Sequence, residues 1–207
     1  MTGGYGPRPG EKVATSARDE PRRPARERLL EAASELFYNE GVQTVGIDRI
    51  IEHAGVAKAS LYNTFGSKEE LVRAYLENRH SGTTKRLLAA VDAHTDPRER
   101  LLAVFDAQGE LFAQNTFRGC AFVTASAEAP RGGLVEQAAD DYRADIRELL
   151  TRLARDAGAA DAALLGRQLQ LIYDGAGLGA RMDRDPSTAQ VARTAASALI
   201  DAALKIG

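Results

Sequence analysis

The sequence has no tryptophan, only two methionines and a single cysteine, Cys120. A lone cysteine excludes a disulfide within the chain and fits a reducing compartment. No apolar run is long enough to span a bilayer, and the first residues (MTGGYGPRPGEK) lack the hydrophobic region of a signal peptide. These absences predict a cytoplasmic protein without a membrane partner.

Catalytic and metal-binding patterns are also missing. The three histidines, His53, His80 and His94, do not have the spacing of metal ligands, and no nucleophile stands near a candidate base. Cys120 has only Arg118 as a neighbouring cation, so a small buried hydrophobic residue is favoured over a reactive thiol. We therefore expect no metal, no cofactor and no catalytic residue, and we do not expect an enzyme.

The composition is that of a soluble globular protein, with 44% hydrophobic and 27% charged residues among 207. Alanine and leucine are abundant and β-branched runs are rare, which favours an all-α fold. The net charge of −2 does not by itself indicate nucleic-acid binding. Basic residues are nevertheless concentrated near one end, as expected if that end meets phosphate. They include Arg18, Arg22, Arg23, Arg26 and Arg28.

Apolar residues at helical spacing predict about nine helices, three short ones at the front and six behind. The first begins near Pro21 or Pro24, because proline is tolerated in the first helical turn, and Gly41 ends it. Residues 67–70 (SKEE) have the sequence of a capping box and open a long helix that runs to about His94. The later helices are expected from residue 96, at 120–129, from 134 to about 158, at 161–182 and at 186–205.

The most informative stretch is 46–71, GIDRIIEHAGVAKASLYNTFGSKEEL. It predicts two short helices joined at Gly55, which adopts the left-handed conformation without a Cβ penalty. In the second helix, 58–65, Leu61 and Phe65 face inward. Its outward side chains are Lys58, Ser60, Tyr62, Asn63 and Thr64. A helix-turn-helix that presents hydrogen-bonding groups on its second helix is suited to the major groove of DNA.

The segment AGVAKASLYNTFGSKEELVRAYLE resembles the signature of TetR-type transcriptional regulators, which reads roughly A-G-V-S-x-G-x-L-Y-x-H-F-x-x-K-E-x-L. The similarity covers about residues 26–77. Ala57 replaces the usual serine and so removes a helix cap, and Ala59 replaces the usual glycine. Asn63 and Thr64 occupy a variable and a usually-histidine position, so the operator sequence is not carried over. The segment GCAFVTASAE also resembles a subgroup of these regulators.

The resemblance implies a homodimer whose two recognition helices enter successive major grooves of a palindromic, double-stranded DNA operator. It also implies a rear helical cavity for a small-molecule inducer that changes the spacing of the two reading heads. By similarity, phosphates would be gripped by Thr44, Tyr62 and Lys68. Bases or backbone would be faced by Lys58, Ser60, Asn63 and Thr64.

Several of these residues have a second interpretation. The arginine cluster, with Arg22, Arg23 and Arg26, either lies along phosphate or the minor groove, or forms a salt-bridged solvated face. Lys68 either contacts phosphate at a helix N-terminus or is a solvated lysine of the capping box. Asn63 either pairs with the edge of adenine or is a surface asparagine.

A rear cavity would be lined by inward aromatic side chains and a few polar groups. The candidates are Phe105, Gln108, Phe112, Phe117, Cys120, Phe122, Tyr142, Tyr173 and Asp174. Each has the alternative of being ordinary core. A pocket of this composition predicts a hydrophobic inducer with one or two polar handles. Arg143, Arg147 and Arg181 could pair with an acidic ligand, although simple surface exposure explains them too.

The last two helices are rich in glycine and alanine, which favours a four-helix dimer interface or tight packing within one protomer. We expect a flexible arm at 1–20, a helix-turn-helix DNA-binding domain at 21–67 and a ligand-binding and dimerisation domain at 68–207. The leading hypothesis is a dimeric repressor released by its inducer. A ligand-independent architectural DNA-binding protein and an all-helical carrier or enzyme remain as alternatives.

Overall fold

The computed structural model describes residue 1 and residues 23–204, and within them the chain forms nine α-helices and no strand. The first four are α1 (Ala25–Glu40), α2 (Ile47–Ala54), α3 (Lys58–Phe65) and α4 (Lys68–Asp92). The rest are α5 (Pro97–Phe112), α6 (Ala121–Glu128), α7 (Leu134–Asp156), α8 (Ala162–Asp183) and α9 (Thr188–Leu204). The all-α prediction is confirmed. The candidate Arg22 and the predicted arm, Met1 apart, lie outside the described residues.

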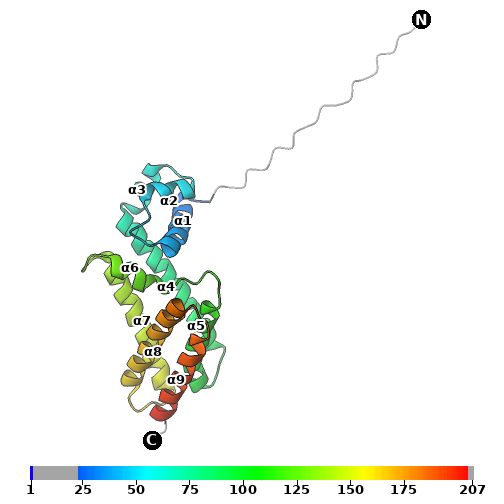
Figure 1. Cartoon of the computed structure of the whole chain (residues 1–207), viewed down its shortest axis with the longest axis vertical. Coiled ribbons are helices and arrows are strands. Elements are labelled where there is room, and N and C mark those ends of the chain that lie inside the picture. Colours follow the sequence, from blue (N-terminus) through cyan, green and yellow to red (C-terminus); the bar gives the residue numbers. More distant parts are fainter. Residues whose placement is uncertain (2–22, 205–207) are drawn as a thin grey trace.

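The helix α4 connects two groups of helices (Figure 1). At one end α1, α2 and α3 gather around its first turns, and we call these three helices the head. Leu29, Ile50 and Leu61 are fully buried between them, each on the apolar face that helical spacing predicts. The other helices surround the remaining length of α4 and form the rear bundle.

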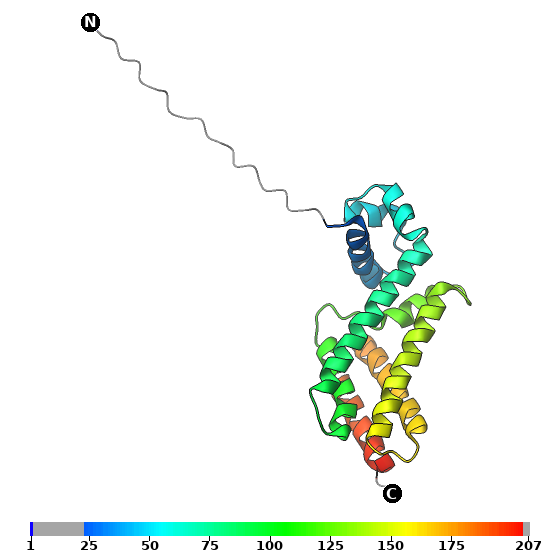
Figure 2. The same cartoon turned by 180° about the vertical axis from the view of Figure 1, so that it is seen from behind.

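The rear bundle is held by extensive contacts between its helices. Helix α7 packs against α8, α9 packs against both α5 and α8, and α4 packs against α5 and α7 (Figure 2). The residues that fill the interior include Leu101, Phe105 and Leu150, none of which is more than 1% exposed. One continuous hydrophobic core runs from the head along α4 into this bundle. The head and the rear bundle are therefore packed together and do not have separate cores.

Helix ends agree with the predicted positions to within a few residues. Pro24 is the N-cap of α1, and α4 ends at Asp92 instead of reaching His94. The capping box at the start of α4 is half confirmed: the Ser67 hydroxyl accepts from the Glu70 amide at 3.1 Å. The Glu70 carboxylate does not reach back but accepts from Nε of Arg73 at 2.8 Å, because Arg73 lies one turn further along the same face.

None of the helices in residues 23–204 combines the length and the apolarity that crossing a bilayer requires.

Candidate nucleic-acid interface

The turn between α2 and α3 has the geometry of a helix-turn-helix. Gly55 takes the left-handed conformation (φ 60°, ψ 43°) that ends α2, and its amide donates to Glu52 O at 3.0 Å. Leu61 is fully buried and anchors α3 from behind, while Phe65 and Val56 pack partly against the same core. Ala57 caps α3 without any side-chain hydrogen bond, as its methyl group requires. Helix α3 is therefore held by packing more than by capping.

The outward face of α3 carries the residues predicted to meet DNA. Lys58, Tyr62, Asn63 and Thr64 are exposed, and Ser60 is partly exposed. Tyr62 is 45% exposed, unusual for a tyrosine with an apolar core beneath it. The head thus presents a short helix with a cation, an aromatic ring, an amide and hydroxyls on its free side.

Lys58 is already paired in the free protein. Its Nζ lies 2.9 Å from Oδ1 of Asp48 on α2, and this hydrogen bond raises the pKa of the lysine. Both side chains are well exposed, so the pair contributes little to stability and can exchange for another anion. Lys58 would reach a phosphate or base only after leaving Asp48.

Thr64 is also engaged, within its own helix. Its Oγ1 donates to Ser60 O at 2.6 Å, a frequent arrangement for threonine inside a helix. The hydroxyl proton is therefore used, and the oxygen remains free to accept. In this rotamer the Thr64 hydroxyl can accept a hydrogen bond from a base but has no proton to donate to a phosphate.

Lys68 lies at the start of α4, beneath the loop between α1 and α2. Its Nζ approaches Gln43 O at 3.5 Å, and burial lowers its pKa, partly opposed by the carboxylate of Glu128. Thr44, the next residue in that loop, is exposed. Thr44 and Lys68 therefore lie on the same side of the head, where the free amides of the α4 N-terminus favour an anion.

Three arginines of the predicted basic cluster, Arg23, Arg26 and Arg28, are described, and all three contact the head. Arg23 forms an ion pair with Glu31 at 2.8 Å, between two exposed side chains. The guanidinium of Arg26 lies 5.6 Å from the centre of the Phe65 ring, at the end of α3. Arg26 thus adjoins the recognition helix, whereas Arg23 takes part in the kind of surface pair that the second interpretation describes.

No local sequence pattern indicates the contacts that fix α1 against the motif. Arg28 donates from Nη1 to Gly55 O at 3.0 Å, and so braces the turn itself. Arg49 forms a two-pronged ion pair with Glu40, and Nε2 of His53 lies 3.0 Å from Glu35. These partners are 9 to 27 residues apart in the chain, beyond the range of a local pattern.

Tyr38 and Glu128 link the head to the rear bundle. The Tyr38 hydroxyl donates to Gly119 O at 3.2 Å and accepts from the Arg118 amide at 2.9 Å. Oε2 of Glu128, at the end of α6, accepts from the Gln43 amide at 3.1 Å. The helix α6 and the loop before it are therefore bonded at two points to the helix and loop that carry the motif.

A small pocket of about 90 Å³, partly open to solvent, lies behind α6, between α4, α5, α7 and α8; we call it the inner cavity. It brings together seven of the nine predicted ligand-binding residues: Gln108, Phe112, Phe117, Cys120, Phe122, Tyr142 and Tyr173. Phe105 is outside it, fully buried in the bundle core. Asp174 also does not line it, since its carboxylate turns to Arg143 at 2.7 Å.

Two side chains that line the inner cavity are charged, Arg79 and Arg86 of α4, and the other lining side chains are neutral. Burial raises the pKa of Tyr173 to about 12 and that of Tyr142 well above its usual value, so both hydroxyls keep their protons. Burial also raises the pKa of the Cys120 thiol, which disfavours the reactive thiolate.

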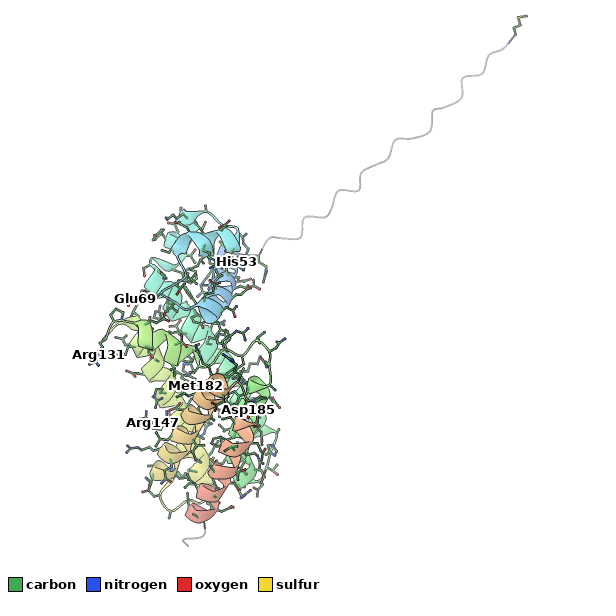
Figure 3. The ribbon with its side chains drawn as sticks, in the orientation of Figure 1. His53, Glu69, Arg131, Arg147, Met182 and Asp185 are labelled. Carbon is green, nitrogen blue, oxygen red and sulfur yellow. The ribbon has the colours of Figure 1, made fainter. Side chains whose placement is uncertain are left out.

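A larger, open cleft of about 710 Å³ lies beside the inner cavity. It is bounded by the end of α1, the loop between α5 and α6, and the turn between α8 and α9, near Asp185 in Figure 3. Tyr38, Phe112 and Phe117 border both spaces. The rings of Phe112 and Phe117 are 4.9 Å apart.

Helices α8 and α9 carry large apolar side chains on the outside of the protomer, which we call the apolar stripe. It consists of Leu164, Leu171, Leu178, Met182 and Val191, all at least 51% exposed (Met182 is labelled in Figure 3). The small residues Ala189, Ala192 and Ala196 are instead buried within the protomer. Tight packing inside one protomer therefore explains these alanines, and the stripe is the unpaired surface.

Comparison with known proteins gives consistent matches. A family model described as bacterial regulatory proteins, tetR family, matches residues 29–75. The chain is 31% identical to a TetR-family transcriptional regulator from Streptomyces coelicolor, with a TM-score of 0.83, over 87% of this chain and 96% of the other. It is 35% identical to a putative TetR-type regulator from Streptomyces avermitilis, with a TM-score of 0.79, over 87% and 98% of the two chains.

The similarity to two curated relatives covers less than half of this chain. The HTH-type transcriptional activator FasR of Mycolicibacterium smegmatis is 40% identical over 87 residues, which are 42% of this chain and 40% of the relative. The HTH-type transcriptional repressor KstR2 of the same species is 33% identical over 96 residues, 45% and 47% of the two chains. The matches thus span less than half the length of these relatives. One of the two is named an activator and the other a repressor.

Proposed function

The chain belongs to the TetR family of transcriptional regulators, which are not enzymes, and from this membership we propose that it represses transcription by binding a palindromic operator as a homodimer. The observation that carries the proposal is α3, exposed on one face and anchored on the other by Leu61. A helix of this kind fits the major groove, which is wide enough to admit it.

The residues of the head divide into two roles in this proposal. Thr44, Tyr62 and Lys68 contact phosphate and set the register on the duplex, as hydroxyl and ammonium donors do without regard to sequence. Asn63, whose amide carries both a donor and an acceptor, reads bases. Lys58, Ser60 and Thr64 are at least partly exposed on α3 and contact bases or backbone, Lys58 once it has exchanged Asp48 for DNA.

The apolar stripe supports the homodimer. Five large apolar side chains on α8 and α9 exceed what a monomer leaves exposed in one place, and no other described element carries such a row. Two copies of α8 and α9 would form a four-helix interface, burying on the order of 2,000 Å² as obligate dimers do. The two-fold axis then places the recognition helices on half-sites about 34–36 Å apart.

The inner cavity and the links through Tyr38 and Glu128 support a response to a ligand. A small molecule that binds better when α6 is displaced would shift the population away from the DNA-competent form by that difference in affinity alone. The head would move with α6 because Arg118, Gly119 and Glu128 are hydrogen-bonded to it.

One observation favours a second candidate, an architectural DNA-binding protein without an inducer. The inner cavity of about 90 Å³ is smaller than the 300–1,000 Å³ of typical ligand pockets. In that case no small molecule would change operator affinity, whereas the repressor model requires at least one that weakens it.

Selection of duplexes from a random pool with the full chain tests the main proposal. The expected product is an inverted repeat, protected by the protein on one face at two sites about one helical turn apart. A protein that binds all duplexes equally, or that selects a single asymmetric site as a monomer, would contradict it.

A further inference from the structure

The lining of the inner cavity is positively charged. Arg79 and Arg86 of α4 border it, and none of the residues that line it is acidic. Thr83 lies between them in sequence and also borders the cavity, so this face of α4 offers two guanidinium groups and a hydroxyl. The rest of the wall is apolar, aromatic or neutral.

Within the part of the chain that the structure describes, Arg86 has no ion-pair partner. Its Nε is buried and makes no hydrogen bond, and no carboxylate in residues 23–204 forms an ion pair with its guanidinium. Arg79 differs, because its guanidinium lies 3.9 Å from the centre of the Tyr38 ring. A partly buried guanidinium without a counter-ion is unfavourable, and an arriving anion would relieve that cost.

The nearest acidic side chain does not supply the missing charge. Asp174 lies close to the cavity, but its carboxylate faces Arg143 on α7 at 2.7 Å and does not border the cavity. The hydroxyls of Tyr142 and Tyr173 are 3.1 Å apart, so one donates to the other and the second proton is left without an acceptor in the described chain. The guanidinium of Arg86 and one of the two tyrosine hydroxyls are therefore hydrogen-bond donors without an acceptor in the described chain.

Gln108 adds one unpaired acceptor. Its Nε2 donates to Tyr173 O at 2.9 Å, which fixes the orientation of the amide. Its Oε1 is buried and accepts no hydrogen bond, and the side chain is only 5% exposed. A buried acceptor of this kind is stabilised by a ligand that brings a hydroxyl or an N–H group.

We propose that the inner cavity binds a small organic acid, whose carboxylate pairs with Arg86 and whose hydroxyl donates to Gln108. The planar guanidinium matches a carboxylate with two parallel hydrogen bonds. The cavity is smaller than the roughly 150 Å³ that holds a benzene ring, so an acid of about four carbons is the expected size. The inference rests on the proposed function, since it names the ligand class of that ligand-responsive regulator.

Calorimetric titration of the full chain with three matched probes tests this inference. Butyramide has the shape without the charge, butyrate adds the charge, and 4-hydroxybutyrate adds the hydroxyl. Butyrate is expected to bind at least about tenfold more tightly than butyramide, the range of a charge-assisted hydrogen bond. The 4-hydroxybutyrate is expected to bind more tightly again, and Gln108→Leu should remove only that last gain.

Arg86→Gln should abolish the preference for butyrate over butyramide. Arg152→Gln is the matched control, because Arg152 is an exposed arginine on α7 that does not border the cavity. Arg86→Lys serves if the glutamine variant does not fold, and it should reduce the preference because an ammonium cannot pair in the two-pronged geometry. Equal affinities for butyrate and butyramide in the wild type, including no binding of either, would overturn the inference. So would a preference that survives in both Arg86 variants.

Operator binding without any probe separates this inference from the proposed function. If operator binding is intact and carboxylate selectivity is absent, only the ligand class is wrong. If the wild type selects no operator, the proposed function itself fails.

Discussion

Single side chains of the head are held differently in the free protein. Asn63 and Tyr62 project from the free side of α3, while Lys58 is paired with Asp48 and Lys68 approaches a backbone carbonyl. Asn63 and Tyr62 could therefore contact DNA directly, whereas Lys58 and Lys68 would first have to leave their present partners. Exchange of an exposed ion pair costs little, so Lys58 remains available.

Phosphate and base contacts predict different mutational signatures. Lys68→Ala should weaken binding to all duplexes similarly and reduce the slope of log affinity against log salt by about one. Asn63→Ala should cost about 1–3 kcal/mol at particular base positions only. Fluorescence anisotropy on the operator and on single-base variants measures both. Lys85→Ala is the control, since it removes an exposed lysine on the same helix about 25 Å away.

Asp174 predicts a pH dependence of stability. Burial raises the pKa of its carboxyl above 3.8, with Arg143 opposing the shift. The folded state then holds the proton more strongly than the unfolded state, so stability falls as pH rises from about 3.8 through the folded value. Asp174→Asn should remove this fall, as measured by urea unfolding across a pH series. A pH profile unchanged from the wild type, with exposed Asp156→Asn as the comparison, would refute the assignment.

At the scale of the element, the recognition helix lacks the cap that its family pattern usually supplies. Ala57 has the extended conformation of an N-cap but no side-chain acceptor, while Ser67 at the start of α4 accepts from the Glu70 amide. The two helices therefore begin with different local support. Packing of Leu61 compensates in α3.

Restoring the cap should stabilise the protein. Ala57→Ser is expected to raise the free energy of unfolding by about 0.5–2 kcal/mol, because its hydroxyl can accept from a free amide of the first turn. Ala59→Ser, within the same helix, should give no gain because serine is a poorer helix former than alanine. Equal effects of the two substitutions in urea unfolding would show that capping does not limit α3.

The whole molecule consists of a head joined through α4 and α6 to a bundle with one apolar outer surface. The head is bonded to the loop before α6 through Tyr38 and to the end of α6 through Glu128. The stripe on α8 and α9 faces away from the protomer core. The distance between the two heads of a dimer would therefore depend on the arrangement of the bundle helices and on the contact between the two copies.

A charge in the apolar stripe should separate the dimer. Leu171→Glu places two like charges near the two-fold axis and is expected to weaken dimerisation by at least about 2 kcal/mol, the range of an interface hot spot. Sedimentation equilibrium measures the change, and operator affinity should fall with it. Val123→Glu alters another exposed apolar residue, on α6 and outside the stripe, and should leave both unchanged. A dimer that persists in Leu171→Glu would exclude this surface as the interface.

Local features of the fold were predictable because each depends on neighbours within one or two turns. The nine helices, the left-handed Gly55, the serine cap at Ser67 and the inward Leu61 all follow from spacing and residue type. The membership of the inner cavity was largely predictable as well, since aromatic residues on inward faces converge there. Phe105 and Asp174 were the exceptions, because their partners lie on other helices.

The sequence alone determined an all-helical chain with a DNA-reading motif, since helix formation, capping and amphipathic spacing are properties of short segments. The tertiary structure decided which charges are already paired, which alanines face the core, and that Arg86 borders the inner cavity without an ion-pair partner among the described residues. Lys58 with Asp48, Arg28 with Gly55 and Tyr38 with Gly119 are 10, 27 and 81 residues apart. Such pairs depend on how whole helices cross, and no local pattern encodes that.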